Sequence, residues 1–594
     1  MHIIDQLIVF IYIGSMVAVG FLLRRRAGES DESYFLADRR LPWWLLSVSG
    51  SVSMYDVTGT MWVISLFYLY GVRSLWVHWL WGFMMGAFLM SYTGKWVRRS
   101  KVITGAQWMR TRFGPGREGE AARGVMTFMA ILFAVSMIAY DFTGIGTFAS
   151  VFFPGWSPQI CGILIIGATT LYVVLGGQYS VAITQLAQTV ILTGAATGLA
   201  IFASVKLDLP AVLEKVAEGW RSVCPPSVAE KAVEGWDSLW PSWDMPFLAG
   251  GTVLIFGPFV MVWILKGLVL NAGGPAQLFD FQTFLSTRSA RDASKAGGLW
   301  SILILSRWAM SMGIAVLGLM MLKPVFDVEH AERVLPEVLQ RIRFAIGLKG
   351  LVLAGFFAAF MSTFDSTVNV AASYVVEDFY KRFLRPAARG RELVYAGYAA
   401  SVLVVGVAIL IGLGQKTIAG IWRWIMMAYG AVALIPNFLR WYWWRFNGWG
   451  YTWGTVGGIA VLFFVTLCFP NWQETRMFPV IASASLLFSL LGTFLTKPTD
   501  QSVLDHFYKV VQPGGLWRPV ARSVAEKSPG FKKDCRFGIE ILNTFLGIIF
   551  ITCLYMAAVT IVLHKFSTVF TLLGVSGACA IVLYFTWYRN LPRD

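Results

Sequence analysis

The sequence predicts an all-α integral membrane protein, and two observations support this prediction. Hydrophobic residues make up 57% of the 594 residues and charged residues only 14%, whereas soluble proteins average about 25% charged residues. Apolar segments about 20 residues long, the length that spans a bilayer as a helix, also recur along the whole chain. No long polar stretch remains for a separate soluble catalytic domain.

About fifteen apolar segments are long enough to span a membrane. The first lacks the basic start and small-residue cleavage site of a signal peptide, so we expect it to remain as a helix. The polar stretches 206–245 and 323–346 should form short amphipathic helices on the outer surface. The segments are 4–23, 43–72, 75–96, 124–152, 157–176, 180–205, 246–270, 297–322, 347–376, 391–414, 418–440, 450–470, 477–496, 536–563 and 566–588.

Most of the net charge of +16 falls between the segments, on alternate sides. Cytoplasmic loops of membrane proteins collect Lys and Arg, so the amino terminus should lie outside and the carboxyl terminus in the cytoplasm. This bias explains the charge better than nucleic-acid binding does, and the basic residues beyond residue 500 should contact anionic lipid. The absence of an Asn-x-Ser/Thr site favours a bacterial plasma membrane. The basic groups are Arg24–Arg26, Lys95–Lys101, Arg288–Lys295, Lys381–Arg385, Lys532–Arg536 and Arg589–Arg593.

Signatures of enzymes and of cofactor sites are missing from the sequence. It has no phosphate-binding loop, no H-E-x-x-H and no G-x-G-x-x-G after a strand. Its six cysteines show no metal-ligand or disulfide spacing, and its five histidines do not cluster. We therefore expect no enzyme, no cofactor and no transition metal, which leaves a secondary transporter, a channel or a membrane scaffold.

Two of the predicted segments contain interruptions. Segment 43–72 is too long for one straight helix, and the polar, small residues Ser49 to Gly59 lie at its middle. Such a stretch lines a cavity or binds a ligand, unless it is a kink hidden between neighbouring helices. Segment 246–270 contains Gly250-Gly251 and Gly257-Pro258, and Pro258 would free backbone carbonyls. Paired interruptions of this kind indicate two inverted repeats of five helices each.

Segment 347–376 supplies a cluster of oxygen-bearing side chains: Ser362, Thr363, Asp365 and Ser366. Hard cations prefer oxygen ligands, so hydroxyls together with freed carbonyls would form a weak sodium site. The alternative is that these hydroxyls serve helix packing. Asp365 favours a functional role, because a carboxylate inside a membrane is costly.

Four motifs in this order resemble the sodium:solute symporter family, which includes the sodium/glucose, proline and sialic acid carriers. The resemblance covers about residues 1–500 and implies a leucine-transporter-like five-plus-five inverted repeat with extra peripheral helices. The divisions it implies are 1–42, repeats 43–205 and 246–440, the outer loop 206–245, two peripheral helices in 441–500, and a C-terminal part 501–594. The motifs are 34–44 (YFLADRRLPWW), 176–185 (GGQYSVAITQ), 282–296 (QTFLSTRSARDASKA) and 359–369 (AFMSTFDSTVN).

The resemblance also implies a sodium site between the first broken segment and segment 347–376. Its ligands would be the backbone carbonyls of Ser49, Val52 and Ala359 and the hydroxyls of Ser362 and Thr363. One departure concerns a second sodium site or a gating role: many family members have an acid where this chain has Gln185. Asp365, with Ser366, could supply that charge from the opposite helix. Alternatively, Asp365 pairs with a nearby cation or backbone group.

Candidate solute contacts follow from the resemblance to sugar carriers. Asp56, His78 and Gln277 fall at or near sugar-binding positions, whereas Ala428 replaces a sugar-binding Gln. The remaining candidates are Ser53, Tyr55 and Arg307, and Arg307 is expected to face the cavity and to pair with Asp56 or Asp141. Asp56 could instead cap a helix, and His78 could lie in an interfacial aromatic belt.

We therefore expect a sodium-coupled symporter that imports a small polar solute by alternating access, with a sugar as the first candidate. Amino acids, carboxylates and nucleosides remain alternatives, and H⁺ is an alternative coupling ion. A channel, or a solute sensor of the transporter type, is the alternative from another class. The sequence leaves the oligomeric state open.

Overall fold

The computed structural model describes residues 2–27, 41–80, 83–240, 243, 246–249, 252–274, 278–415, 417–470, 472–534 and 536–592. Side chains are not described at 23–27, 79–80, 175–180, 246–249, 252–256 and 278–280.

Helices make up nearly all of the first part of the described chain, before residue 240. These are α1 (Ile3–Ala27), α3 (Trp43–Ser53), α4 (Val57–Tyr70), η2 (Gly71–Leu80), α5 (Met85–Phe88), η3 (Leu89–Thr93), α6 (Gly94–Arg99), α7 (Gly105–Phe113), α8 (Arg117–Ser150), α9 (Pro158–Lys206), α10 (Leu209–Arg221) and α11 (Pro226–Val233).

A short antiparallel hairpin, β1 (Pro246–Ala249) and β2 (Thr252–Ile255), opens the second part, and helices follow. These are α12 (Phe256–Ala272), α13 (Leu278–Leu285), α14 (Ala290–Leu303), α15 (Leu305–Met321), α16 (Val328–Glu332), α17 (Val334–Arg341), α18 (Leu348–Tyr374), η4 (Val375–Leu384), α19 (Arg391–Leu413), α20 (Ile418–Ile425), η5 (Met426–Ala431), α21 (Leu434–Tyr442), α22 (Gly448–Cys468), α23 (Glu474–Phe494), α24 (Gln501–Val511), α25 (Arg518–Lys527), α26 (Phe537–Val562), α27 (Phe566–Thr586) and η6 (Tyr588–Asn590).

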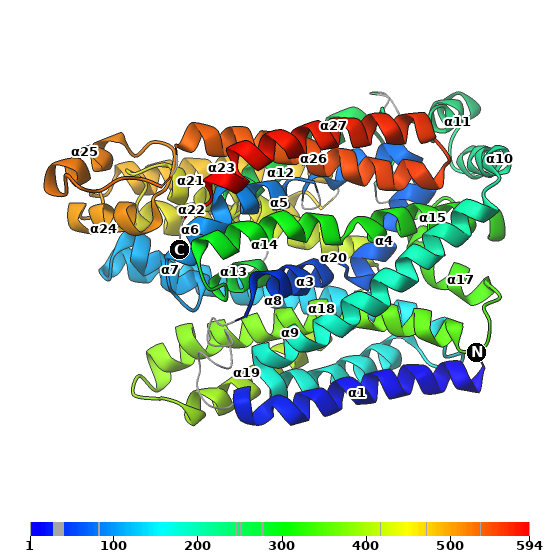
Figure 1. Ribbon diagram of the computed structural model, residues 1–594, viewed down its shortest axis with the longest axis horizontal. Coiled ribbons are helices and arrows are strands. Elements are labelled where there is room, and N and C mark those ends of the chain that lie inside the picture. Colours follow the sequence, from blue (N-terminus) through cyan, green and yellow to red (C-terminus); the bar gives the residue numbers. More distant parts are fainter. Residues whose placement is uncertain are drawn as a thin grey trace.

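The long helices confirm the predicted membrane protein. Within the described residues, 12 helices are long and apolar enough to cross a membrane, and Pro158–Val174 and Gly257–Ala272 are shorter apolar helices. The long helices run along one common direction, with α10 and α11 at one end of the molecule and α24 and α25 at the opposite end (Figure 1). The predicted segments 157–176 and 180–205 form one continuous helix, α9, which begins at Pro158 and ends at Lys206.

The first predicted interruption is confirmed. Segment 43–72 forms two helices, α3 and α4, and Asp56 between them has non-helical backbone angles (φ 12°, ψ 121°). Its carboxylate accepts hydrogen bonds from the backbone N–H groups of Thr58 (2.9 Å) and Gly59 (2.8 Å). Asp56 is therefore the N-cap that restarts the helix, as one of the two interpretations of this residue expected.

The second interruption lies elsewhere than predicted. Residues 246–255 form the β-hairpin instead of the start of a helix, so the prediction of one helix over 246–270 is wrong there. Pro258 lies in the first turn of α12, where a missing N–H breaks no helical hydrogen bond. The break instead separates the end of α12 at Ala272 from the start of α13 at Leu278, beside Gly274 with its left-handed φ of 104°.

Helix α18 forms the centre of the molecule. All its residues from Val352 to Tyr374 are buried, and it packs against α1, α3, α8 and α9. Its first turn is capped from outside the helix, because Asp5 of α1 accepts hydrogen bonds from the N–H groups of Gly347 (2.9 Å) and Gly350 (3.0 Å). The oxygen-rich segment predicted from the sequence is therefore held on all sides.

One of the two C-terminal helices is not peripheral, which corrects the expectation from the sequence. α26 packs against α15 and α5, and its Glu540 forms a buried ion pair with Lys95 of α6 (2.8 Å). α27 fits the peripheral description better, since only 22% of its span is buried.

Candidate functional site

Oxygen atoms from α3 and α18 converge where the sodium site is predicted. Ser362 Oγ lies 2.9 Å from the carbonyl oxygen of Val52 and 2.8 Å from that of Ala359. Thr363 Oγ1 donates to the carbonyl oxygen of Ser53 (2.6 Å) and lies 3.4 Å from that of Ala359. These contacts bring four of the five predicted ligands together, at the point where α3 ends at Ser53 against the middle of α18.

The carbonyl of the fifth predicted ligand, Ser49, lies one helical turn earlier. It accepts a hydrogen bond from Ser53 Oγ (3.0 Å), and the same hydroxyl lies 3.2 Å from the carbonyl oxygen of Ser362. Ser53 therefore links Ser49 to α18.

A hydrogen-bonded network surrounds Asp365 beside these oxygens. Its carboxylate accepts from Tyr172 (2.6 Å), Gln185 (3.3 Å) and Ser366 (3.4 Å). Gln185 Nε2 also lies 2.9 Å from Ser53 Oγ and 3.0 Å from Ser366 Oγ. The structure thus brings Gln185, Asp365 and Ser366 together, and the described partners of Asp365 are neutral hydrogen-bond donors.

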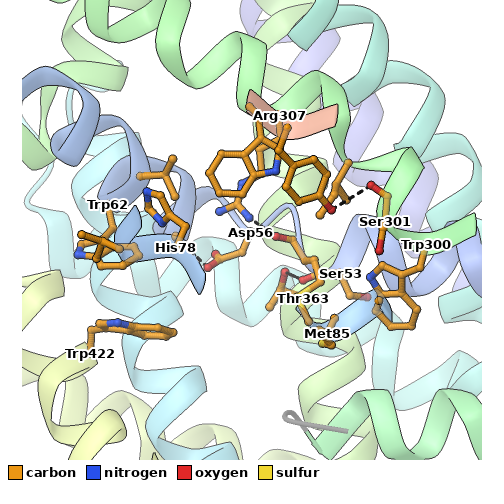
Figure 2. A pocket seen from close by; sticks show the side chains of 18 of the residues that line it. Ser53, Asp56, Trp62, His78, Met85, Trp300, Ser301, Arg307, Thr363 and Trp422 are labelled. Atoms are coloured by element: carbon orange, nitrogen blue, oxygen red, sulfur yellow. Dashed lines mark hydrogen bonds between the residues drawn. The ribbon is translucent and has the colours of Figure 1, made fainter. Parts of the chain in front are cut away.

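A cavity of about 90 Å³ lies on the other side of the break in segment 43–72. One water molecule needs about 10–15 Å³ of such space, so the cavity can hold a small solute. Ser53, Asp56, His78 and Arg307 line it together with Thr363, and Figure 2 shows Ser53 and Thr363 beside Asp56. The predicted solute contacts and the predicted sodium ligands are therefore neighbours.

Arg307 and Asp56 hold opposite ends of the broken helix. Arg307 Nη1 donates to the carbonyl oxygen of Met54 at the end of α3 (2.6 Å), and Nε donates to Thr60 (3.1 Å). A cation suits the negative end of a helix dipole and an anion the positive end, so each side chain finds its partner in the backbone. The charges of Arg307 and Asp56 act on each other, but no direct ion pair joins Arg307 to Asp56 or Asp141 among the described residues.

His78 lies inside the cavity wall, so its placement in an interfacial belt is wrong. Its ring stands edge-on to Trp62 (5.3 Å between centroids) and Trp308 (5.1 Å), as Figure 2 shows for Trp62. Tyr55 is buried and its hydroxyl lies 3.1 Å from that of Ser306, but its side chain is not part of the lining. Gln277 lies outside the described residues.

Aromatic residues from four distant helices complete the wall, and sequence reasoning missed them individually. Trp422 and Trp263 each lie against Trp62, with ring centroids 5.7 Å and 6.0 Å away. Tyr555 of α26 stacks on Trp308 (5.3 Å) and donates to the carbonyl oxygen of Ser301 (3.0 Å). The 26 tryptophans signal aromatic walls in general, but nothing local distinguishes these from interfacial ones.

Comparisons with known proteins agree with this geometry. The sodium/mannose cotransporter of Bos taurus is 26% identical over 500 residues, which are 77% of this chain and 78% of that protein. The sodium/proline symporter of Haemophilus influenzae is 28% identical over 249 residues, but the match spans only 48% of its length. A solved Na⁺-coupled sialic acid symporter superposes with a TM-score of 0.63 at 18% identity, covering 84% of this chain and 99% of that one.

The similarity to the sialic acid symporter shows a shared fold only, because the sequence identity of 18% is too low to indicate more. The family model of the sodium:solute symporter family matches residues 34–458, which is most of the chain and includes the broken segment and α18. The chain therefore belongs to the sodium:solute symporter family.

Proposed function

We propose that the protein is a sodium-coupled symporter that imports a small polar solute by alternating access. The observation that supports this most strongly is the convergence of Val52, Ala359, Ser362 and Thr363 between α3 and α18. In the described state, the hydroxyls donate to the carbonyls. A sodium ion would take the same oxygen atoms as ligands, with Ser49 as the fifth, and would join α3 to α18 more strongly than hydrogen bonds do.

Sodium binding from outside would then stabilise the state in which the solute cavity is complete. The membrane potential adds about 2.3 kcal/mol per 100 mV for each charge moved inward. The sodium gradient therefore drives accumulation of a solute that binds next to the ion. Ser53 is the link between the two, because its hydroxyl contacts α18 and its side chain lines the cavity.

Asp365 is the proposed replacement for the acid that many family members have at the position of Gln185. The contact of 3.3 Å between Gln185 Nε2 and Asp365 Oδ1 supports an exchange of roles between these positions. Asp365→Asn should weaken the sodium dependence of uptake, and adding Gln185→Glu to it should restore much of that dependence. Unchanged sodium dependence in Asp365→Asn contradicts this role, including any part for Ser366.

The cavity wall supports a solute with flat faces and a few polar groups. Indole faces can stack on sugar rings, and Asp56, His78 and Arg307 offer polar contacts. A sugar remains the first candidate, and amino acids follow, because the similar proteins include mannose and proline carriers.

Uptake into proteoliposomes tests the proposal. The panel would contain mannose, glucose, proline, sialic acid, a monocarboxylate and a nucleoside, each with and without an inward sodium gradient. We expect one class to accumulate only with sodium, and Thr363→Ala should abolish that accumulation. Solute entry that is indifferent to sodium contradicts symport, and conductance without a fixed ion-to-solute ratio would indicate a channel.

A further inference from the structure

Asp141 of α8 is a buried carboxyl group to which the proposed mechanism gives no role. Its side chain is 0% exposed, and neither carboxylate oxygen accepts a hydrogen bond from a backbone, hydroxyl, amide or cationic donor among the described residues. An ionised carboxylate without a partner is among the costliest groups to bury. A bound species that neutralises it would remove this cost.

The surroundings of Asp141 supply further oxygen atoms. α4 packs against α8, and the carboxyl group of Asp56, just before α4, lies close enough to interact with that of Asp141. The Thr58 hydroxyl, also 0% exposed and without a partner, meets α8 at Gly144, where an added Cβ would lie 2.1 Å from it. Gly144 follows Asp141 by about one helical turn.

Two carboxyl groups side by side cannot both stay ionised unless a cation lies between them. The other charged or titratable groups that act on the pair are Arg307 of α15 and Tyr140 of α8. Arg307 approaches only Asp56, and its donors are directed at Met54 and Thr60. The positive charge already present therefore leaves Asp141 unneutralised.

We propose that Asp141 and Asp56, together with the Thr58 hydroxyl, hold a second monovalent cation, Na⁺ or H⁺, between α4 and α8. The ligands are oxygen atoms, which hard cations prefer, and the solute cavity lined by Asp56 gives the ion an entry path. This inference rests on the proposed symport and gives it a second coupling ion.

Both ions would then act on the same broken helix. The first joins α3 to α18, and the second joins α4 to α8. Without the second ion the two carboxylates repel each other and favour separation of α4 from α8. Occupation removes the repulsion, so closing of the cavity would depend on the ion.

Sodium binding to the purified full-length protein tests whether Na⁺ occupies the site, and it requires no knowledge of the solute. Radioactive Na⁺ is titrated with choline chloride keeping the ionic strength constant. We expect Asp141→Asn to bind one sodium ion fewer than wild type, whereas Thr363→Ala loses the ion between α3 and α18. The control, Glu214→Gln on the exposed face of α10, should keep both.

Melting temperatures measured over a pH series in sodium-free buffer test whether H⁺ occupies the site. If H⁺ is the occupant, the sodium count is equal in wild type and Asp141→Asn. The wild-type melting temperature should then rise by more than that of the variant as the pH falls from about 8 to about 5. Asp56→Asn is the second variant, because Asn caps a helix as well as Asp does, and it should behave like Asp141→Asn.

The proposal is overturned if wild type and both variants agree in sodium count and in pH response. A wild-type protein that binds no sodium at all contradicts the proposed function instead, so the two failures are distinguishable. Asp141→Glu, which keeps the carboxyl group, should retain the second ion and shows that the loss in Asp141→Asn is not misfolding.

Discussion

Two acidic side chains flank the broken helix, Asp365 of α18 and Asp141 of α8, and both are 0% exposed. Asp365 accepts hydrogen bonds from Tyr172, Gln185 and Ser366, whereas no such donor within the described chain reaches Asp141, which meets the carboxyl group of Asp56 instead. The two carboxyl groups are thus equally buried, but they differ in the number of hydrogen-bond donors around them. The hydrogen-bonded carboxylate of Asp365 is fixed in place by other helices, whereas that of Asp141 can meet a cation without losing a donor. The comparison teaches that the donors around a buried acid say more about its role than its depth does.

The largest expected effect comes from removing the hydrogen-bonded acid. Asp365→Ala leaves the Tyr172 hydroxyl and the Gln185 amide without their acceptor, and breaking one partner out of a buried polar network costs about 3–5 kcal/mol. The unfolding free energy of the purified protein in detergent, without sodium, measures this. Asp365→Asn keeps an acceptor oxygen and should lose less than half as much. If Asp365→Ala lowers the unfolding free energy by less than about 1 kcal/mol, the hydrogen bonds to Asp365 do not stabilise the protein as this comparison requires.

Glu332 lies outside the candidate membrane spans, and its hydrogen bonding is intermediate between that of Asp365 and that of Asp141. Its carboxylate accepts from the N–H groups of Ile418 (3.2 Å) and Ala419 (2.9 Å) at the start of α20. Burial raises its pKa to about 7, although these hydrogen bonds partly oppose the shift. Because the folded pKa lies above the unfolded value, its stabilising contribution is complete below about pH 4.5 and is lost as the pH rises through about 7. At about 1.4 kcal/mol per pKa unit, the loss is about 3 kcal/mol.

Glu332→Gln should therefore remove this part of the pH dependence. The measurement is the difference in melting temperature between about pH 5 and about pH 8 for wild type and variant. Glu329→Gln, an exposed neighbour on the same short helix, is the matched control; it should change the pH response only slightly, because its charge is the smallest contribution to the pKa shift of Glu332. Equal pH responses of wild type and Glu332→Gln would mean that the two backbone donors satisfy the carboxylate completely.

Replacement by Ala, which should destabilise the protein at Asp365, should not lower the unfolding free energy at Asp141. Asp141→Ala removes a buried charge that has no partner to lose, and replacing uncompensated buried charge is neutral or stabilising by about 1–2 kcal/mol. The unfolding free energy is compared in choline chloride and in sodium chloride. Wild type should regain the difference in sodium if the ion binds there. Destabilisation of Asp141→Ala in choline by as much as Asp365→Ala would show that Asp141 has partners after all.

The features that could be predicted from the sequence are local ones. The polar run Ser49–Gly59 predicts a broken helix because its residues are consecutive, and the hydroxyls of Ser362 and Thr363 lie on one turn. The contrast between Asp365 and Asp141 could not be predicted. It depends on whether donors on other helices, such as Tyr172, reach the carboxylate, and spacing along the chain gives no information about that.

Two errors have a similar physical origin. Gly257-Pro258 predicts a break inside a helix, but the same residues also suit a helix start, and only the hairpin before them decides between the two. Arg307 was expected to pair with an acid, because sequence reasoning counts charged side chains and overlooks the partial charges of helix ends. The role of α26 was missed because its apolar composition resembles that of α27, which faces outward.

The smallest expected effect concerns Tyr555, a single satisfied hydroxyl on α26. Tyr555→Phe keeps the ring that stacks on Trp308 (5.3 Å) and loses only the hydrogen bond to the carbonyl oxygen of Ser301 (3.0 Å). One such bond contributes about 1 kcal/mol, or roughly a fivefold change in affinity. Tyr555 lines the solute cavity, and its hydrogen bond goes to Ser301, away from the proposed ion ligands. The KM for the solute should therefore rise severalfold. The maximal rate and the sodium dependence should stay the same.

Tyr584→Phe, on the exposed side of α27, is the matched control for expression and handling. A fall in the maximal rate without a change in KM would mean that α26 acts on the conformational change instead of on the solute. A loss of sodium dependence in Tyr555→Phe would break the comparison itself, since it would couple the ion sites to a helix that contributes no oxygen ligand to either. An effect confined to KM separates the cavity wall, where one hydroxyl adjusts the affinity for the solute, from the two buried acids, whose proposed roles concern the coupling ions.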